Sequence, residues 1–389
     1  MQRFDTIVLG LGAMGSATAF QLSRRGKRVL GIDRFSPPHV HGSTHGDTRI
    51  TRLGIGEGPQ YTPLAMRSHQ IWRRLERETG RTLLTTNGGL VLSSKARTSQ
   101  CHTDDFFANT VAAAQKYDIP HELLDADQIR RRFARFNVAD DESGYYEPSA
   151  GFVRPEECVR AQLDLAAHHG ALLHRGERAT AFDANGAGVT VTTDRDTYAA
   201  EALIITAGPW LPELVSPLVA RHLTVHRQVL CWFDIDGPVT PFLPENFPVF
   251  IWELQGRSQG IYGFPAIDGA SGGLKVATES YDQATTPERA DRFVSDVETR
   301  AIYDDYVAPY VSGLSSKCVK AATCLYTVTP DFGFVIDTLP GEDRVIVASP
   351  CSGHGFKHSA AIGEALAQRV VDGASSINLD AFALGRFRQ

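Results

Sequence analysis

The chain lacks three features that would place it in a specialised class of protein. It has no C-x-x-C pair among its six cysteines, no run of about 18 apolar residues, and no excess of positive charge, since 39 Lys and Arg residues stand against 45 Asp and Glu residues. Scattered cysteines favour reduced thiols over a disulfide framework. A net charge of −6 argues against nucleic acid or an anionic membrane as a partner.

Targeting signals and repeats are also missing. The first predicted strand begins by Thr6, so no leading apolar segment of the signal-peptide type is expected. There is no internal repeat and no low-complexity tract. We therefore expect a cytoplasmic protein, and a length of 389 residues with 42% hydrophobic and 22% charged content suits a globular protein of two domains.

The segment at residues 4–33 has the pattern of a dinucleotide-binding unit. Gly10, Gly12 and Gly15 fit G-x-G-x-x-G between a predicted strand and helix, and the next strand ends at Asp33. The glycines allow a tight turn, a close approach of the backbone to a pyrophosphate, and close packing of the helix on the strand. The acid can accept hydrogen bonds from a ribose. A nicotinamide dehydrogenase would share this pattern.

Strand and helix patterns typical of a nucleotide-binding fold occur in three separate parts of the chain. Predicted helices cover residues 14–25, 61–80, 106–116, 126–133, 155–169 and about 357–371. Residues 222–280 have β character with little helical period, and residues 138–155 are polar and rich in Gly and Pro, which is typical of a crossover between domains. We predict an α/β fold in which a discontinuous Rossmann-like cofactor domain receives an inserted β-rich substrate domain. The predicted cofactor domain comprises residues 1–82, 151–216 and 319–389, and the substrate domain residues 83–150 and 217–318.

A second unusual cluster, PPHVHGSTHGDTRITR, spans residues 37–52. Its glycines can expose backbone amides to phosphate, and an arginine can stack on a ring or bind a carboxylate. His39, His41 and His45 are close enough in sequence to consider a metal, but nothing nearby completes a ligand set, so no metal is predicted. A solvated loop rich in turns is the remaining interpretation of these residues alone.

Four blocks, in order across essentially the whole chain, carry a family resemblance. They are PPHVHGSTHGDTRITR (37–52), YGFP followed by GLK (262–265 and 273–275), AATCLYT (321–327) and SGHGFK (352–357). With these blocks the sequence closely resembles the monomeric sarcosine oxidase and N-methyltryptophan oxidase family of FAD-dependent amine oxidases. The resemblance implies that the cofactor domain binds FAD and that the protein is a monomer.

The resemblance further implies FAD tethered through its 8α-methyl carbon to the sulfur of Cys324. Such a thioether raises the reduction potential of the ring and prevents loss of the cofactor. Taken alone, Cys324 would be read as a buried inert thiol, and Cys318 lies outside the matching block. The residues expected to contact the cofactor are Gly10, Gly12, Gly15, Asp33, Ser43, Thr48, Cys324, Gly353, Gly355 and Phe356.

Three residues match positions that serve the reaction in that family. Lys275 matches the lysine that activates oxygen, where a fixed cation lowers the barrier to the first electron transfer to O2. Arg49 matches the arginine that lies over the flavin ring, and His45 a histidine close to the flavin. A helix beginning near Lys357 is implied to direct its N-terminal amides at the negative charge of the reduced ring.

The substrate positions match in part and depart in part. Arg52 and Lys357 match the pair of cations that binds the substrate carboxylate, and Tyr262 matches a tyrosine that lines the pocket. The family has a histidine where this chain has Glu279, and a tyrosine where it has Ile55. Both departures put sarcosine itself in doubt as the best substrate, and we expect Glu279 and Ile55 to influence which side chain is accepted.

We predict an FAD-dependent oxidase of secondary, N-methyl amino acids. A hydride passes from the carbon beside nitrogen to flavin N5, water hydrolyses the imine, O2 becomes H2O2, and N-methyl substrates yield formaldehyde. The alternatives are a dehydrogenase that passes electrons to a quinone or a carrier protein, an oxidase of cyclic or larger amino acids, and a non-catalytic nucleotide-binding protein.

Overall fold

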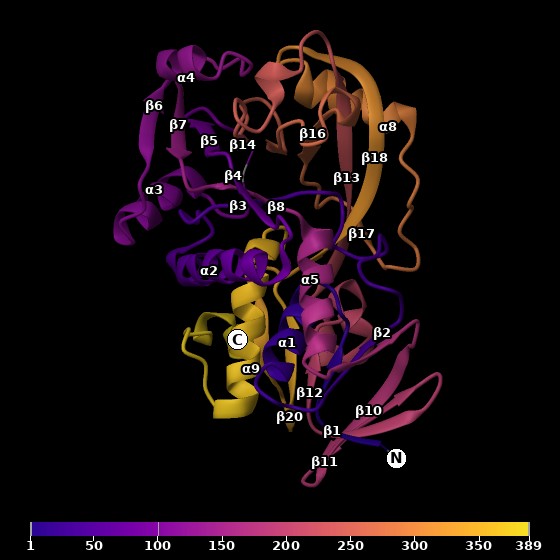
Figure 1. Ribbon diagram of the computed structural model, residues 1–389. Helices are drawn as coiled ribbons and strands as arrows, with labels where there is room; N and C mark the ends of the chain where they lie inside the picture. Colours follow the sequence, from indigo (N-terminus) through magenta and orange to yellow (C-terminus); the bar gives the residue numbers. More distant parts are fainter. Residues whose placement is uncertain (1, 100, 388–389) are drawn as a thin grey trace.

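The protein is built around two large β-sheets with helices packed mainly on the first (Figure 1). The computed structural model describes residues 2–99 and 101–387. In Figure 1 the eight-stranded sheet and helices α1, α5 and α9 form the lower half, and the nine-stranded sheet forms the upper half. The predicted α/β fold class is confirmed.

The eight-stranded sheet has a parallel centre that begins with the N-terminal strand. Its members are β1 (Gln2–Leu9), β2 (Val29–Asp33), β9 (Leu172–Arg175), β10 (Ala179–Asn185), β11 (Gly188–Thr193), β12 (Thr197–Ile205), β19 (Val335–Leu339) and β20 (Glu342–Ser349). Strand β1 pairs in parallel with β2 on one side and β12 on the other, so Val8 lies between Gly31 and Ile204. Such strands are apolar along their length because both faces of a parallel sheet are covered.

Helix α1 (Ala13–Ser23) packs against both α5 (Pro155–His168) and α9 (Ser359–Asp372), and α2 (Thr62–Thr79) packs against α9. The contact between α1 and α9 is close, because a Cβ placed on Gly363 would lie 2.3 Å from the Cβ of Ala17. These four helices begin and end within two residues of the predicted ranges. Their apolar stripes supply most of the largest core.

The nine-stranded sheet forms a second core rich in aromatic side chains. Its members are β5 (Gly89–Ser94), β6 (Glu122–Asp125), β7 (Glu142–Glu147), β13 (Thr224–Ile235), β14 (Val249–Trp252), β15 (Ile261–Gly263), β16 (Leu274–Thr278), β17 (Ala284–Thr285) and β18 (Leu314–Val328). Strands β13 and β18 form a long antiparallel pair in which Gln228 faces Cys324. Strand β18 keeps the chain in this sheet as far as Val328, whereas we placed residues from 319 onward in the cofactor domain; the domain boundaries stay a prediction.

A three-stranded sheet connects the two halves and carries Arg49. It consists of β3 (Arg49–Thr51), β4 (Leu84–Thr86) and β8 (Gly151–Val153), with β8 in the middle. The polar segment 138–155 passes from one large sheet toward the other, but it does so through β7 and β8. The remaining helices are α3 (Phe106–Lys116), α4 (Ala126–Arg132), α6 (Leu211–Leu214), α7 (Pro217–Ala220) and α8 (Asp296–Ile302).

None of the helices formed by the described residues is long and apolar enough to cross a membrane.

Candidate active site

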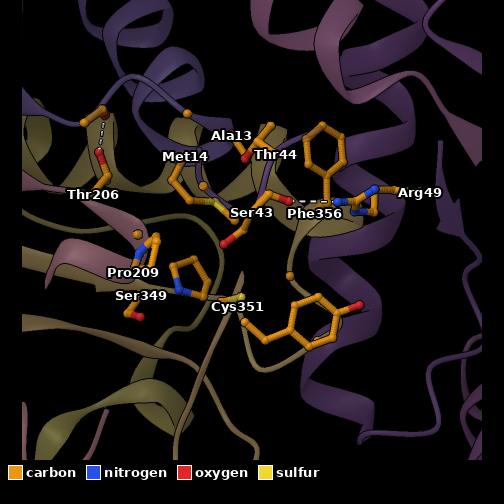
Figure 2. Close-up of a pocket in the computed structure, with 18 of the residues that line it drawn as sticks. Ala13, Met14, Ser43, Thr44, Arg49, Thr206, Pro209, Ser349, Cys351 and Phe356 are labelled. Carbon is orange, nitrogen blue, oxygen red and sulfur yellow. Dashed lines mark hydrogen bonds between the residues drawn. The ribbon is translucent and has the colours of Figure 1, made fainter. Parts of the chain in front are cut away.

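An elongated cavity extends from the carboxyl ends of β1 and β2 to the inner face of the nine-stranded sheet. At one end it is lined by Gly10, Gly12 and Asp33, and at the other by Tyr262 and Lys357. Figure 2 shows part of its wall, which includes Ser43, Thr44, Arg49, Cys351 and Phe356.

The glycine-rich turn is shaped for close packing. Gly10 has a φ of +87°, and a Cβ there would lie 2.5 Å from the carbonyl oxygen of Thr206. A Cβ at Gly15 would lie 1.7 Å from the carbonyl oxygen of Gly10, so only glycine lets α1 begin at this distance from β1. Gly15 serves this packing and does not line the cavity, whereas Gly10 and Gly12 do.

The nucleotide end fits a dinucleotide such as FAD. No side chain caps the N-terminus of α1, and Gly12 and Ala13 line the cavity, so the positive end of the helix faces the space in which a pyrophosphate would lie. Asp33 is buried at the same end, where its carboxylate accepts the N–H groups of Leu11 at 2.7 Å and Phe35 at 2.8 Å. These contacts hold the acid at the cavity wall, in position for a ribose.

The loop before β3 is held by buried and partly buried contacts. The carboxylate of Glu156, on α5, accepts the N–H groups of Gly46 and Asp47. The Arg49 guanidinium donates to the carbonyl oxygens of Thr48 and Ser43, both at 2.8 Å, which fixes its plane at the cavity wall (Figure 2). Ser43 lines the cavity beside Arg49.

Lys275 lies behind this loop and His45 belongs to it, and neither side chain lines the cavity. The Lys275 ammonium donates to the carbonyl oxygen of Gly46 at 2.6 Å and to the carbonyl and hydroxyl oxygens of Thr48 at 3.2 and 3.3 Å. Burial and the charge of Arg49 lower the pKa of Lys275 well below its ordinary value. Burial, Arg49 and Lys275 lower the pKa of His45 to about 3, so the His45 ring is neutral.

Two thiols lie near one another at the junction of the sheets. Cys324 is fully buried and shares a small apolar cluster with Tyr326, against which Cys351 packs. Of the two thiols, Cys351 lines the cavity, and its sulfur accepts the N–H of Thr327 at 3.4 Å. Burial raises the pKa of the Cys324 thiol, while the nearby charge of Arg49 opposes this effect.

The segment before α9 brings several predicted residues to the cavity. Gly353, Gly355, Phe356 and Lys357 all line it, and the chain turns into a short 3-10 helix at Phe356 that runs directly into α9. The predicted helix start near Lys357 therefore lies at the cavity wall.

Arg52 and Lys357 converge on one carboxylate, that of Glu57. An Arg52 Nη atom lies 2.9 Å from one Glu57 oxygen, and Lys357 Nζ lies 3.5 Å from the other. Arg52 and Glu57 have side chains 3% and 4% exposed. Burial alone would raise the pKa of Glu57, but the charges of Lys357 and Arg52 lower it well below its ordinary value. Burial lowers the pKa of Lys357 to about 8, although Glu57 opposes the shift.

Of the two positions that depart from the family pattern, Glu279 lines the cavity and Ile55 does not. Glu279 lines the cavity and makes an ion-pair contact of 2.9 Å with His102. Tyr262 also lines it, with its hydroxyl 3.3 Å from that of Tyr326. Ile55 does not contact the cavity, contrary to our expectation of a substrate contact. It is fully buried in the core of the first sheet, because the loop after β3 turns its side chain toward the helices.

The residues of the cavity wall that escaped prediction include Glu57, His102, Cys351 and His354. Cys351 and His354 lie beside or within the SGHGFK block, and that adjacency is the signal that could have found them. Glu57 and His102 lie in segments without a recognisable motif. Within the described residues, no group of three or more His, Cys, Asp or Glu side chains is placed to hold a metal.

A family model and several proteins of known activity match nearly the whole chain. The model described as "DAO: FAD dependent oxidoreductase" matches residues 5–369. Monomeric sarcosine oxidase of Streptomyces avermitilis is 43% identical over 374 residues, covering 96% of this chain and 95% of that protein. N-methyl-L-tryptophan oxidase of Yersinia pestis is 35% identical over 386 residues, covering 99% of this chain and all of that protein.

Solved structures share the fold. NikD, described as an unusual amino acid oxidase essential for nikkomycin biosynthesis, superposes with a TM-score of 0.84 at 24% identity and covers 98% of each chain. Glycine oxidase from Geobacillus kaustophilus superposes with a TM-score of 0.78 at 19% identity over the full length of both chains. These likenesses place the two sheets in the architecture of an FAD domain with a substrate domain.

Proposed function

Because the chain belongs to the DAO family of FAD-dependent oxidoreductases, we propose that it is an oxidase of secondary amino acids, with N-methyl amino acids as its substrate class. The proposal is supported by relatives at 35–43% identity that are named for oxidation of sarcosine and N-methyl-L-tryptophan. When bound, FAD supplies the two-electron oxidation of the amine and the transfer of those electrons to O2.

The observation that carries this proposal is the convergence of Arg52 and Lys357 on one buried carboxylate at the substrate end of the cavity. A site that holds a carboxylate between two cations is suited to the carboxylate of an amino acid. The carboxylate of Glu57 occupies this position in the free protein, so a substrate carboxylate would replace it. Tyr262 lines the same end of the cavity, where it offers an aromatic ring and a hydroxyl group.

Other residues act on the oxygen and cofactor sides. We assign Lys275 to O2 reduction, since its ammonium is held by three oxygens of the loop that leads into Arg49. We assign Arg49 to the flavin ring, because two carbonyl oxygens fix its guanidinium at the cavity wall. His45 is neutral and is assigned to the surroundings of the flavin without a proton-transfer role.

We infer that Cys324 forms the covalent bond to FAD. The neighbouring Cys351 offers a matched control, because both thiols border the same cluster. Acid precipitation of the unmodified protein should leave yellow flavin in the pellet, and Cys324→Ala should move the flavin to the supernatant while Cys351→Ala should not. Mass spectrometry of the flavin-bearing peptide gives the same answer directly. Flavin found on Cys351, or wholly in the supernatant from the unmodified protein, contradicts the inference.

A peroxide assay across three substrate classes tests the proposed function. N-methyl amino acids, cyclic imino acids and primary amino acids are supplied under air, and H2O2 and formaldehyde are measured. We expect the highest kcat/KM with an N-methyl amino acid, together with one H2O2 per formaldehyde. Turnover with an artificial electron acceptor but little H2O2 under air would indicate a dehydrogenase. A preference for cyclic imino acids would shift the substrate class.

We also propose that the protein is a monomer in the cytoplasm, as the name of its sarcosine-oxidising relatives suggests for their assembly state. Light scattering coupled to size exclusion should return the mass of one chain, 42.5 kDa.

A further inference from the structure

His102 lies in a strained turn that faces the carboxylate of Glu57. Its φ of +58° places a non-glycine residue in the left-handed region, and its side chain is only 6% exposed. The Thr103 N–H donates to the carbonyl oxygen of Cys101 at 2.6 Å, and the Thr103 hydroxyl donates to that of Gly56 at 3.3 Å. The turn is therefore tied to the loop that carries Glu57.

The His102 ring lies between two carboxylates from different parts of the fold. Nε2 lies 2.9 Å from Glu279, just after β16, and Nδ1 lies 3.4 Å from Glu57. The Tyr281 hydroxyl donates to the same Glu279 oxygen at 3.1 Å, which fixes that carboxylate. Burial alone would lower the pKa of His102, but Glu279 and Glu57 raise it to about 9, so the ring is a cation at neutral pH.

The neighbouring groups His354 and Cys101 are neutral and do not oppose the positive charge of His102. The ring of His354 lies 5.0 Å away between centroids, and burial lowers the pKa of His354 well below its ordinary value, so that ring is neutral. Burial raises the pKa of the adjacent Cys101 thiol, which is therefore also neutral. Lys357 and Arg52 are the remaining charges: Lys357 contacts the same Glu57 oxygen as His102, and Arg52 contacts the other oxygen.

The surroundings of Glu57 define where a carboxylate is stable in this cavity. Its oxygens lie 2.9 Å from Arg52, 3.5 Å from Lys357 and 3.4 Å from His102. A substrate carboxylate that replaces Glu57 enters the same surroundings and meets three cations. Lone buried cations are costly, so each of them needs the anion that it faces.

We propose that His102 is a third cation of the substrate-carboxylate site and that Glu279 is the positioning residue that holds the His102 ring in place and protonated. This inference rests on the proposed function, because it needs an amino acid substrate. Glu57 and Glu279 face these three cations, and a substrate carboxylate that replaces Glu57 leaves the number of negative charges facing them unchanged. The site is thus matched to an amino acid with a single carboxylate and an uncharged side chain.

Binding of an unreactive carboxylate tests the role of His102 without turnover. The flavin-loaded protein is titrated with propionate and with its neutral analogue propionamide, and Kd is measured from the change in the flavin spectrum. His102→Gln should raise the Kd of propionate roughly tenfold to hundredfold near pH 7, the range expected for a charge-assisted hydrogen bond. The Kd of propionamide should change less than twofold. His222→Gln, a histidine stacked on Phe387 away from the cavity, is the matched control.

The pH dependence separates the role of Glu279 from that of His102. In the unmodified protein the affinity for propionate should fall as pH rises through about 8 and 9, where Lys357 and then His102 lose their protons. Glu279→Gln removes the charge that raises the pKa of His102, so the His102 part of this fall should move to lower pH. His102→Gln should keep the fall near pH 8 and lose the part near pH 9.

The results that would overturn the third-cation site differ from those that would overturn the proposed function. An unchanged Kd for propionate in His102→Gln, or an unchanged pH profile in Glu279→Gln, overturns the third-cation site even if the protein oxidises N-methyl amino acids. If His102→Gln does not fold, the Glu279→Gln profile decides alone. Absence of N-methyl amino acid oxidation in the unmodified protein, with normal propionate binding, overturns the substrate class and leaves the anion site standing.

Discussion

At the scale of single residues, the chemistry of this protein depends on charges buried next to compensating groups. Lys275 is satisfied by three oxygens, while Arg52 and Lys357 share one carboxylate. A buried charge without such partners would cost several kcal/mol. Lys275 and Lys357 are assigned to different steps of the reaction, O2 reduction and substrate binding, so substitution of each should affect its own step.

Lys275→Met should slow reoxidation of the reduced flavin by O2 by orders of magnitude and largely spare anaerobic reduction by substrate. The methionine keeps an apolar stem of similar length and removes the charge that lies over the rings of Trp232 and Phe264. Stopped-flow absorbance measures the two half-reactions separately. Lys320→Met is the control, since Lys320 also lies over Trp232 but is half exposed and pairs with Asp47 at the surface. Equal reoxidation rates in the two variants would remove Lys275 from the oxygen step.

Lys357→Met should raise KM for an N-methyl amino acid by about tenfold to hundredfold, the cost of one charge-assisted hydrogen bond. Amines without a carboxylate should be poor substrates and insensitive to the change. The ammonium is the binding form and its pKa is lowered to about 8, so affinity for carboxylates should fall as pH rises above 8. Lys357→Arg should abolish the part of that fall near pH 8, because guanidinium stays charged, and keep the part near pH 9 that belongs to His102. Inhibition by propionate across pH measures it, and a fall retained near pH 8 in Lys357→Arg contradicts the assignment.

At the scale of elements, close packing of helices sets the position of the cofactor-binding turn. Helix α1 lies between α5 and α9, and its contact with α9 requires a residue without a Cβ at position 363. Because the N-terminus of α1 faces the cavity, a displacement of this helix would move the backbone groups assigned to the pyrophosphate.

Gly363→Val should destabilise the protein by about 1–3 kcal/mol or more, since its Cβ would start 2.3 Å from that of Ala17 and force the helices apart. Thermal unfolding of the flavin-loaded protein measures the effect as a lower Tm. Gly186→Ala, where a Cβ meets open space, is the control and should leave Tm nearly unchanged. A Tm equal to that of the unmodified protein would show that α9 can shift without cost.

At the scale of the whole molecule, Glu147 joins the nine-stranded sheet to the loop after β3. This residue ends β7, in the nine-stranded sheet, and is fully buried. Its carboxylate accepts the N–H groups of Leu53 and Gly54 at 2.8 and 2.9 Å, and the hydroxyls of Tyr145 and Ser149 at 3.0 and 2.7 Å. The loop that carries Arg52 is thereby held by the other half of the molecule.

Glu147→Gln should cost about 1–3 kcal/mol of stability and raise KM for amino acid substrates, because an amide nitrogen cannot accept the N–H that it would face. Denaturant unfolding and steady-state kinetics measure the two effects. Tyr145→Phe removes only one of the four donors and should affect stability less and KM little. A KM unchanged in Glu147→Gln would mean that the Arg52 loop keeps its position without this carboxylate.

Local pattern was sufficient for the glycine turn and for helices α1, α2, α5 and α9. These features are each specified by residues close together in the sequence, so the ends of the four helices could be predicted within two residues, whereas strands β9, β10 and β19 were not predicted. The SGHGFK block and the loop before β3 were likewise placed at one cavity. Family membership also followed from the sequence alone, since the matching blocks extend over nearly the whole chain.

Only the tertiary structure decided which charges face one another. Glu57, His102, Glu279 and Lys357 come from four distant segments, and no periodicity or turn chemistry in the sequence relates them. Ile55 shows the same limit, because its burial in the core and not at the cavity wall depends on how its loop packs against the helices. Local interactions determine local conformation, whereas the partner of a buried charge depends on how the two sheets close on each other. For that reason the sequence by itself determined the family and its cofactor, and the closure of the fold determined the third cation beside the carboxylate site.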